Sequence, residues 1–203
     1  ANPLENGTNI EVSVLKDTLE KAKGAFDAIA LKNHDRALTP QRIEDLLQGT
    51  KVIRVESGSE KTWKDLLEPY LPGNIRAVTI NDRYIRNSYQ FKSLEMLLDF
   101  FCEIPHENGV EVVINTTSED EEKAINHFRS LQIHYNNKPI NIKYNLNKMS
   151  VEMPHYRRIQ IKSKSGDCSL WLDKGIDIYR YENLQKPNFH TVDTYIVVER
   201  KPQ

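Results

Sequence analysis

An alternation of short apolar runs with longer amphipathic segments occupies the middle of the chain and constrains its fold more than any other feature. Three runs have the length and composition of strands, at 75–80, 110–115 and 139–146. The two segments between them carry apolar residues at helical spacing: Leu94, Leu97, Leu98 and Phe101 in the first, and Ala124, Ile125, Phe128 and Leu131 in the second. Strands that alternate with helices in this way form a parallel sheet. We therefore predict an α/β fold with a largely parallel sheet flanked by helices.

Further elements are expected on both sides of this core. Alternating residues at 51–56 predict a strand, and the apolar spacing that begins at Trp63 predicts a short helix. Downstream, 156–173 has the pattern of two short strands joined by a turn that contains glycine, and 191–199 has that of a last strand. These strands should extend or edge the parallel sheet.

Residues 1–49 are interpreted as an N-terminal helical segment, and 50–203 as the α/β domain. The apolar residues of the N-terminal segment follow a 3-4-3-4-3 spacing, at Val12, Leu15, Leu19, Ala22, Phe26 and Ile29. A seam this narrow is typical of a helix that pairs with one other helix. That other helix belongs either to the same chain, to a second copy or to an upstream domain. Because the chain begins with Ala1 rather than methionine, we expect it to be part of a larger protein.

Composition and motifs exclude several classes of function. The formal net charge is −1, so no overall field attracts nucleic acid or an anionic membrane, and an anion site needs a local cluster of cations. Walker loops, dinucleotide glycine motifs and Gly-x-Ser-x-Gly elbows are absent from the sequence, and its six histidines follow no metal pattern. No cofactor or metal is therefore expected.

The cellular compartment is predicted from the cysteines and from apolar runs. Cys102 and Cys168 lie in apolar or strand-like surroundings without metal spacing, which is typical of reduced, buried thiols. The sequence shows no signal peptide and no apolar run long enough to span a membrane. These features predict a cytoplasmic location.

The first cluster of candidate binding residues follows the strand at 75–80 and consists of Asp82, Arg83, Tyr84 and Arg86. Ligands of open α/β sheets bind beyond the carboxyl ends of the strands, where this loop should lie. Arginine suits phosphate or carboxylate because it donates two parallel hydrogen bonds. A structural role explains the same residues equally well, with Asp82 capping the turn and the arginines paired with surface acids.

The second cluster lies at the start of the strand pair at 156–173. His155 and Arg157 are two residues apart, so on a strand their side chains share a face, and Arg158 adds a further cation. Such a face suits either the binding of an anion or phosphodiester chemistry. The competing interpretation is structural, because a lone histidine on a strand is more often a hydrogen-bonded structural residue than a nucleophile.

The first cluster resembles a motif of the phospholipase-D-like domain found at the C-terminus of MIT (microtubule-interacting and trafficking) proteins and in bacterial proteins of varied architecture. Residues 80–86 (INDRYIR) and the following Gln90 are similar to the family's strand, its Asp-Pro-Tyr-Ile-Arg sequence and the Gln that opens its next helix. The chain departs from the family at Arg83, which stands at the usual proline.

The second cluster resembles another motif of the same family. Residues 155–159 (HYRRI), Trp171 and residues 175–179 (GIDIY) are similar to the family's His-Asp-Arg strand, a further strand and a closing Gly-Arg-Gly-Leu-Asp-aromatic sequence. Here Tyr156 replaces the Asp, and residues 173–174 (DK) replace Gly-Arg. The resemblance covers roughly residues 50–203, and it suggests a bacterial-type member of the family.

The resemblance also indicates what chemistry is missing. Enzymes of the wider phospholipase D superfamily use a His-x-Lys motif with an Asp five residues beyond the Lys, and two such units form one site. One histidine attacks phosphorus and the other protonates the leaving oxygen. In this chain Arg157 stands at the Lys, Lys162 stands at the Asp, and one such unit is present. A monomer therefore lacks the two histidines, whereas a homodimer would pair two copies of His155 across its two-fold axis.

The family resemblance implies a phospholipase-D-like fold, with a mixed, largely parallel sheet flanked by helices, that serves as a non-catalytic binding or targeting module. It would act as a homodimer within a larger protein and dock an anionic ligand, such as an acidic lipid headgroup or a phosphorylated partner. The expected binding residues are Asp82, Arg83, Tyr84, Arg86, His155, Arg157, Arg158 and Asp177, of which Asp177 would orient His155. The alternative is a dimeric phosphodiesterase or nuclease in which His155 is the nucleophile and Arg157, Arg83 and Arg86 hold phosphate. Nucleic acid is then a possible substrate.

Overall fold

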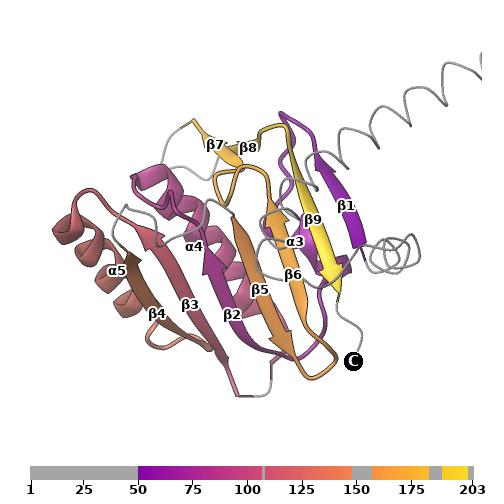
Figure 1. Ribbon diagram of the computed structural model, residues 1–203, viewed down its shortest axis with the longest axis horizontal. Helices are drawn as coiled ribbons and strands as arrows, with labels where there is room; N and C mark the ends of the chain where they lie inside the picture. The colour runs from indigo at the N-terminus through magenta and orange to yellow at the C-terminus, as the bar shows by residue number, and fades with distance from the viewer. Residues whose placement is uncertain (1–49, 107, 148–156, 183–188, 201–203) are drawn as a thin grey trace, which may run out of the picture. The chain divides into compact units, whose positions relative to one another are not determined.

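A computed structural model describes residues 50–106, 108–147, 157–182 and 189–200 of the chain. Seven strands form one mixed sheet in the order β1-β9-β6-β5-β2-β3-β4 (Figure 1). Their bounds are β1 Thr50–Val55, β2 Ile75–Asn81, β3 Val110–Thr117, β4 Ile140–Asn147, β5 Arg158–Ser163, β6 Cys168–Leu172 and β9 Thr194–Arg200. Strands β2, β3 and β4 are parallel, and the pairs from β2 through β5, β6 and β9 to β1 are antiparallel.

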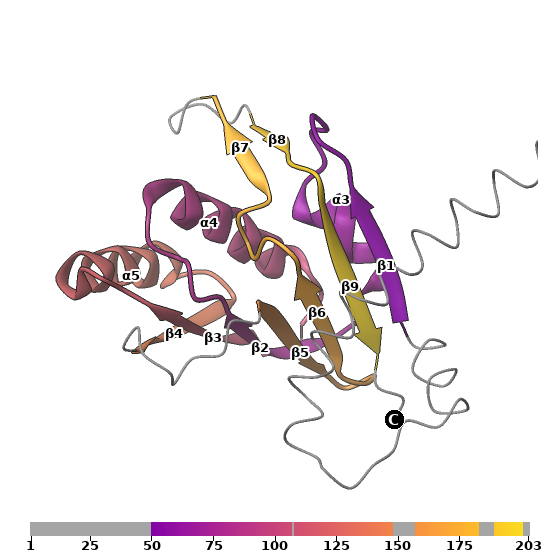
Figure 2. The same ribbon diagram turned by 45° about the horizontal axis from the view of Figure 1, so that its top comes forward.

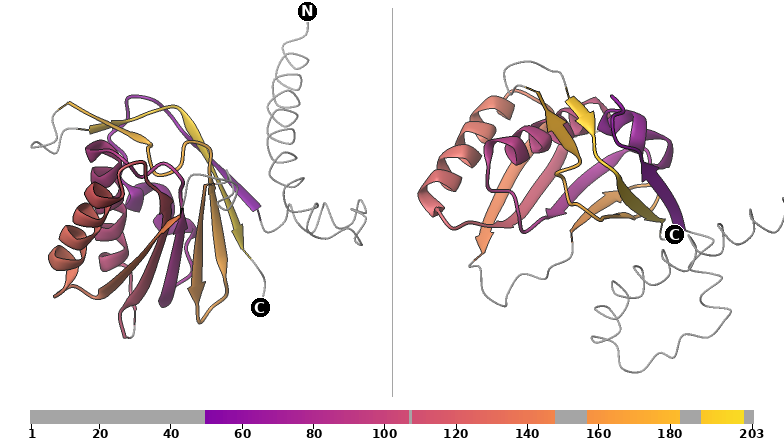
Figure 3. Two further views of the ribbon diagram at one scale, coloured as in Figure 1. Left: turned by 60° about the vertical axis from the view of Figure 1, so that its left-hand side comes forward. Right: turned by 90° about the horizontal axis from the view of Figure 1, so that it is seen from above.

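The helices of the α/β domain that the model describes cover one face of this sheet (Figure 2, Figure 3). They are α3 Trp63–Leu67, the 3-10 turn η1 Glu68–Tyr70, α4 Ser88–Glu103 and α5 Glu121–Tyr135. Each α-helix begins at a capping side chain: Thr62 and Asn87 form capping boxes with Asp65 and Gln90, and Asp120 accepts from the third helical N–H. These caps satisfy N–H groups that have no partner within the helix.

The core lies between the sheet and the helices. Alternate residues of each strand face it, as Val78 and Ile80 of β2 do, and both are fully buried. Helix α4 meets them with Leu94, Leu97, Leu98 and Phe101, the spacing from which the helix was predicted. Burying one such aliphatic side chain stabilises the fold by about 1.5–3 kcal/mol. The intervening strand residues lie on the opposite face, and they are mostly polar.

The predicted α/β class is confirmed, as are the strands and helices expected between residues 51 and 146. The repeated strand–helix unit forms the parallel part of the sheet. The strand pair predicted at 156–173 forms β5 and β6, which lie in the middle of the sheet because β5 pairs with β2 and β6 pairs with β9. Residues 1–49 lie outside the described residues, so the N-terminal helical segment and the domain boundary stay predictions.

A second, two-stranded sheet was not predicted. It pairs β7 (Tyr179–Tyr181) with β8 (Phe189–Thr191), and it divides the last predicted strand, because β9 begins only at Thr194. Aromatic contacts hold β7 in place: the ring of Tyr179 packs edge-on against Trp63 and Phe189, with centroid distances of 5.6 Å and 4.9 Å. This anchoring fixes the chain that follows β6, which forms one wall of the candidate site.

Candidate anion-binding site

The loop after β2 is joined to the turn after β6 by one buried carboxylate. Asp82 is 3% exposed, and its two oxygens accept hydrogen bonds from the backbone N–H of Tyr84 at 2.9 Å and of Ile176 at 2.8 Å. The first bond closes an Asx-type turn, which confirms the structural role predicted for this residue. The second links residues that lie 94 positions apart in the sequence. Asp82 therefore holds two walls of the site together.

Gly175 is required for this link. Its φ angle is +66°, in the left-handed region, and a Cβ atom at this position would lie 2.0 Å from Oδ2 of Asp82 and 2.9 Å from Cδ of Arg157. Neither the backbone conformation nor the space suits a larger residue. The turn can approach Asp82 so closely only because residue 175 has no side chain.

Burial raises the pKa of the Asp82 carboxyl above its ordinary value of 3.8. The two backbone N–H groups and the nearby Arg157 act in the opposite direction, because they favour the ionised form. The cost of burying the charge outweighs them. Asp82 is therefore a strongly desolvated group whose protonation is coupled to folding.

The ring of Tyr84 lies between two guanidinium groups. The central carbon of Arg157 is 4.8 Å from the ring centroid, and that of Arg86 is 5.2 Å from it. Both distances are within the range of a cation–π contact. Arg86 also donates to Glu119 at 2.7 Å and to Oγ1 of Thr117 at 3.1 Å. The charge of Arg86 is therefore partly neutralised by a neighbouring acid, as the structural interpretation predicted.

Arg157 differs from Arg86 because no described carboxylate forms an ion pair with it, although the charge of Asp82 lies nearby. Its Nη1 donates to the backbone carbonyl of Asp173, and its Nε is buried with no hydrogen-bond partner. Within the described part of the chain, Arg157 forms no ion pair. The guanidinium keeps its positive charge and spare donors beside the Tyr84 ring, which is the arrangement that an oxyanion requires.

The structure brings together four of the eight predicted site residues: Asp82, Tyr84, Arg86 and Arg157. The backbone carbonyl of Arg83 belongs to the same loop and accepts from Thr117 at 2.8 Å. Asp177 instead pairs with Arg180 at 3.0 Å. His155 lies outside the described residues, so its predicted contact with Asp177 is untested.

Arg158 lies apart from this group. Its Nη2 donates to Oγ of Ser169 at 2.7 Å, and its guanidinium lies 4.5 Å from the ring of Trp171. Arg157 and Arg158 were predicted to form one cluster, but successive residues of an extended chain project to opposite faces. Their described partners are accordingly different.

Three residues of the site were not predicted as binding residues: Gly175, Thr117 and Glu119. Of these three, only Gly175 had a signal in the sequence, because it opens the stretch 175–179 (GIDIY) that resembles the family's closing motif. Thr117 and Glu119 follow β3, and only the parallel pairing of β2 with β3 brings them to Arg86. Such neighbours become visible only once the strand order is known.

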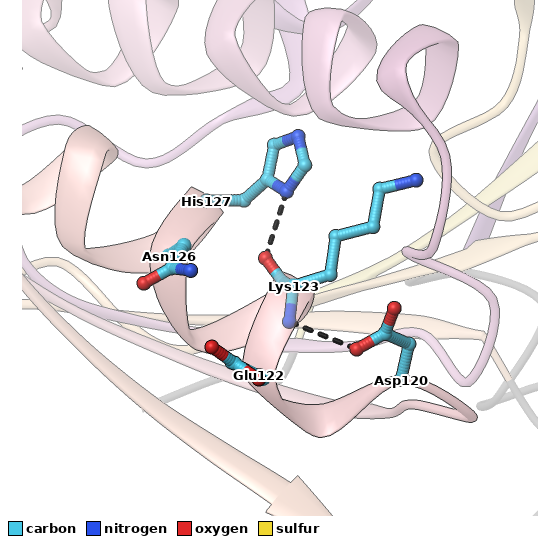
Figure 4. A pocket seen from close by; sticks show the side chains of 5 residues that line it. All are labelled: Asp120, Glu122, Lys123, Asn126 and His127. Atoms are coloured by element: carbon cyan, nitrogen blue, oxygen red, sulfur yellow. Dashed lines mark hydrogen bonds between the residues drawn. The ribbon is translucent and has the colours of Figure 1, made fainter.

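A separate shallow hollow lies at the start of α5 and is lined by Asp120, Glu122, Lys123, Asn126 and His127 (Figure 4). Its polar contacts belong to the helix itself, since Asp120 caps the N–H of Lys123 at 3.0 Å and His127 Nδ1 lies 2.9 Å from the Lys123 carbonyl. The ring of His127 stacks on Phe91 with a centroid distance of 4.6 Å. These contacts account for the side chains of Asp120 and His127 without a ligand.

The described residues show neither a metal centre nor a membrane helix. No group of three or more His, Cys, Asp or Glu side chains among them is placed to hold a metal ion. No helix among them is both long and apolar enough to cross a bilayer. Cys168 is buried, which raises the pKa of its thiol to about 11, so this thiol stays protonated at neutral pH.

The mixed sheet, the helices on its face and the cationic loop beyond the carboxyl ends of its parallel strands define a phospholipase-D-like α/β domain. Residues 61–195 match the model of the family described as the phospholipase D-like domain at the C-terminus of MIT, and the chain belongs to this family. The resemblance stated from the two sequence motifs is thereby confirmed. The match includes every element from α3 to β8.

Other comparisons add little. No curated protein matches the chain. Among solved structures, it is similar to TrmBL2, described as an archaeal chromatin protein with a novel mode of DNA binding, with 10% sequence identity and a TM-score of 0.33. That similarity covers 99% of this chain and 64% of the archaeal one. A likeness of this degree supports no conclusion about fold or activity.

Proposed function

We propose that this domain is a non-catalytic phospholipase-D-like binding module that docks a phosphate-bearing ligand beside Tyr84. The observation that carries the proposal is the guanidinium of Arg157, which forms no ion pair within the described residues and lies 4.8 Å from the Tyr84 ring, next to the loop that Asp82 fixes. The net charge of −1 provides no general attraction for anions, so binding depends on this local group.

The wall around Arg157 is preorganised. The Asp82 carboxylate fixes both the loop that carries Tyr84 and the turn that carries Gly175, and this turn packs against the stem of Arg157. A phosphate group that accepts from Arg157 would not have to order either segment. Preorganised donors bind more tightly because less conformational entropy is lost.

The same residues do not favour catalysis. The superfamily reaction needs a carboxylate to orient its histidine. The equivalent position in this chain is Lys162, an exposed residue of β5 that pairs with Ala77 of β2. The carboxylate nearest to Arg157 in the described site, Asp82, is engaged by two backbone N–H groups. Both observations support a binding role over the alternative of a phosphodiesterase that uses His155.

The proposed ligand carries a phosphate group, either on a lipid headgroup or on a phosphorylated partner, and the module acts as a cytoplasmic homodimer within a larger protein. Light scattering coupled to size-exclusion chromatography tests the assembly. A mass near twice 23.6 kDa supports the homodimer, and a mass near 23.6 kDa at micromolar concentration contradicts it.

Titration calorimetry with inositol trisphosphate tests the binding site. We expect Arg157→Gln to weaken binding by at least about tenfold, because a charge-assisted hydrogen bond contributes roughly 1.5–3 kcal/mol. Arg129→Gln, which removes the same charge from an exposed position of α5, is the matched control and should bind normally. Equal affinities for the two variants would contradict the proposal.

Turnover of a generic phosphodiester tests the enzymatic alternative. The binding proposal predicts no turnover by the wild-type chain above that of His155→Ala. Hydrolysis that requires His155 would replace the proposal with the dimeric phosphodiesterase.

A further inference from the structure

Helices α3, α4 and α5 lie on one face of the sheet (Figure 2), and a row of polar side chains crosses the other face. It contains three asparagines at matching positions of β4, β3 and β2. Nδ2 of Asn145 donates to Oδ1 of Asn115 at 2.8 Å, and Nδ2 of Asn115 donates to Oδ1 of Asn81 at 2.9 Å. The amides thus form a ladder in which every donor points the same way.

The direction of the ladder leaves donors at one end. The Oδ1 of Asn81 accepts from Asn115, while within the described residues nothing accepts from its Nδ2. A chain of hydrogen bonds polarises its members, so the last N–H group is a better donor than an isolated amide. The next residue in the row, directly opposite Asn81, is Arg158.

Arg158 is half-buried and has no anionic partner. Its guanidinium is fixed by the hydrogen bond to Ser169 and by the ring of Trp171, and its Nε is buried with no acceptor. No ion pair to it is found within the described part of the chain. The guanidinium is held by these contacts and its buried Nε has no acceptor, so Arg158 is placed to donate to an oxyanion.

The next pair of β2 and β5 residues on this face adds further polar side chains beside Asn81 and Arg158. Gln160 lies two residues after Arg158 on the same face and directly opposite Thr79. Neither side chain has a hydrogen-bond partner among the described residues. Directly opposite residues of an antiparallel pair have Cβ atoms about 5 Å apart, so the four side chains of these two pairs are close enough to contact one small ligand.

We propose that Arg158, Asn81 and Gln160 form a second oxyanion site, which takes a phosphate group. A phosphate offers three acceptor oxygens, and the three side chains offer donors from three corners of one patch of sheet. This site lies on the open face, whereas the Tyr84 site lies at the strand ends. It does not depend on the function proposed for Arg157, and either site can bind without the other.

NMR of the ¹⁵N-labelled chain tests this site with inorganic phosphate, added at constant ionic strength. The side-chain amide signals of Asn81 and Gln160 should shift and saturate together. Arg158→Gln should weaken this response by at least about tenfold, since it removes the charge that assists the bond. Arg157→Gln should leave the response unchanged while it weakens binding at the Tyr84 site by at least about tenfold.

Asn81→Asp gives an independent test that does not remove the arginine. The new carboxylate still accepts from Asn115, but it also pairs with Arg158 and repels phosphate, so the Gln160 response should disappear from a folded protein. Asn141→Asp makes the same charge change on β4, away from Arg158, and should respond like the wild type.

Three results would overturn the second site: no saturable shift in the wild type, an unchanged response in Arg158→Gln, or a response that only Arg157→Gln removes. The last of these would leave the function proposed for Arg157 intact. Sedimentation with phosphatidylcholine vesicles, with and without a phosphoinositide, then identifies the source of the phosphate. Sedimentation that needs both the phosphoinositide and Arg158 indicates a lipid headgroup, and binding of free phosphate alone indicates a soluble ligand.

Discussion

The contact between Gly175 and Asp82 allows a sharp test of how the site is assembled. An alanine at position 175 must adopt a φ angle near +66°, which costs an L-residue about 1–2 kcal/mol. Its methyl group would also lie 2.0 Å from Oδ2 of Asp82, so the carboxylate has to move away from the N–H of Ile176. Losing a hydrogen bond to a charged group costs roughly 1.5–3 kcal/mol. We therefore expect Gly175→Ala to lower the free energy of unfolding by about 2.5–5 kcal/mol.

Gly58→Ala is the matched control for this variant. Gly58 also has a positive φ, of +82°, but a Cβ atom there would meet no other atom within 4 Å. Only the backbone strain should appear, so the expected loss is about 1–2 kcal/mol. Urea unfolding followed by circular dichroism measures both losses, with equal slopes indicating that the unfolded states are comparable.

A double-mutant cycle decides whether the collision with Asp82 is the cause. In an Asp82→Ala background the obstructing carboxylate is absent, so adding Gly175→Ala should cost the backbone strain of about 1–2 kcal/mol and a shift of the Arg157 side chain, whose Cδ lies 2.9 Å from the position of the new methyl group. The two substitutions should therefore be non-additive by roughly 1.5–3 kcal/mol, the size of the lost hydrogen bond. If the losses instead add to within about 0.5 kcal/mol, the link between the two walls has been misread.

Three further outcomes follow from the site and its supports. Because burial raises the pKa of Asp82, the folded protein binds this proton more tightly than the unfolded chain. The free energy of unfolding therefore falls as pH rises from the ordinary pKa of 3.8 through the raised pKa of the folded state. Asp82→Asn should remove that part of the pH dependence in urea titrations carried out at a series of pH values. Tyr84→Leu should weaken phosphate binding several-fold in calorimetry but leave the fold intact, since a partly exposed cation–π contact contributes about 0.5–1 kcal/mol. Asp120→Ala removes the cap of α5 and should cost about 1 kcal/mol by the same unfolding assay, whereas Asp120→Asn should retain most of it.

The sequence was most informative where local pattern and tertiary burial agree. The apolar spacing of α4 and α5 and the strands between them were predicted because the residues that face the core recur with the period of each element. The two-stranded sheet β7-β8 was missed because its strands have three residues each, too few to show a period. Its position depends instead on aromatic contacts of Tyr179 with residues distant in the sequence.

The candidate site was only partly predictable for a related reason. Motifs identified Asp82, Tyr84 and Arg157 as functional candidates, and the strand-end rule placed the loop correctly. Which group neutralises each arginine depends on the order of strands in the sheet, which no local pattern contains. Arg86 forms an ion pair with Glu119 because β3 lies next to β2, while Arg157 donates a hydrogen bond to a backbone carbonyl.

The same reasoning explains why adjacent arginines serve different surfaces. The pairing of β2 with β5 places Asn81 opposite Arg158 on the open face, and the next residue outward on each strand, Asp82 and Arg157, belongs to the site at the strand ends. The pair Asn81 and Arg158 therefore lies on the open face of the sheet, and the adjacent pair Asp82 and Arg157 lies at the strand ends. Substitutions of Arg157 and Arg158 are in consequence the most discriminating pair in the chain: a single merged anion site requires them to act alike, whereas the geometry requires each to remove one response and spare the other.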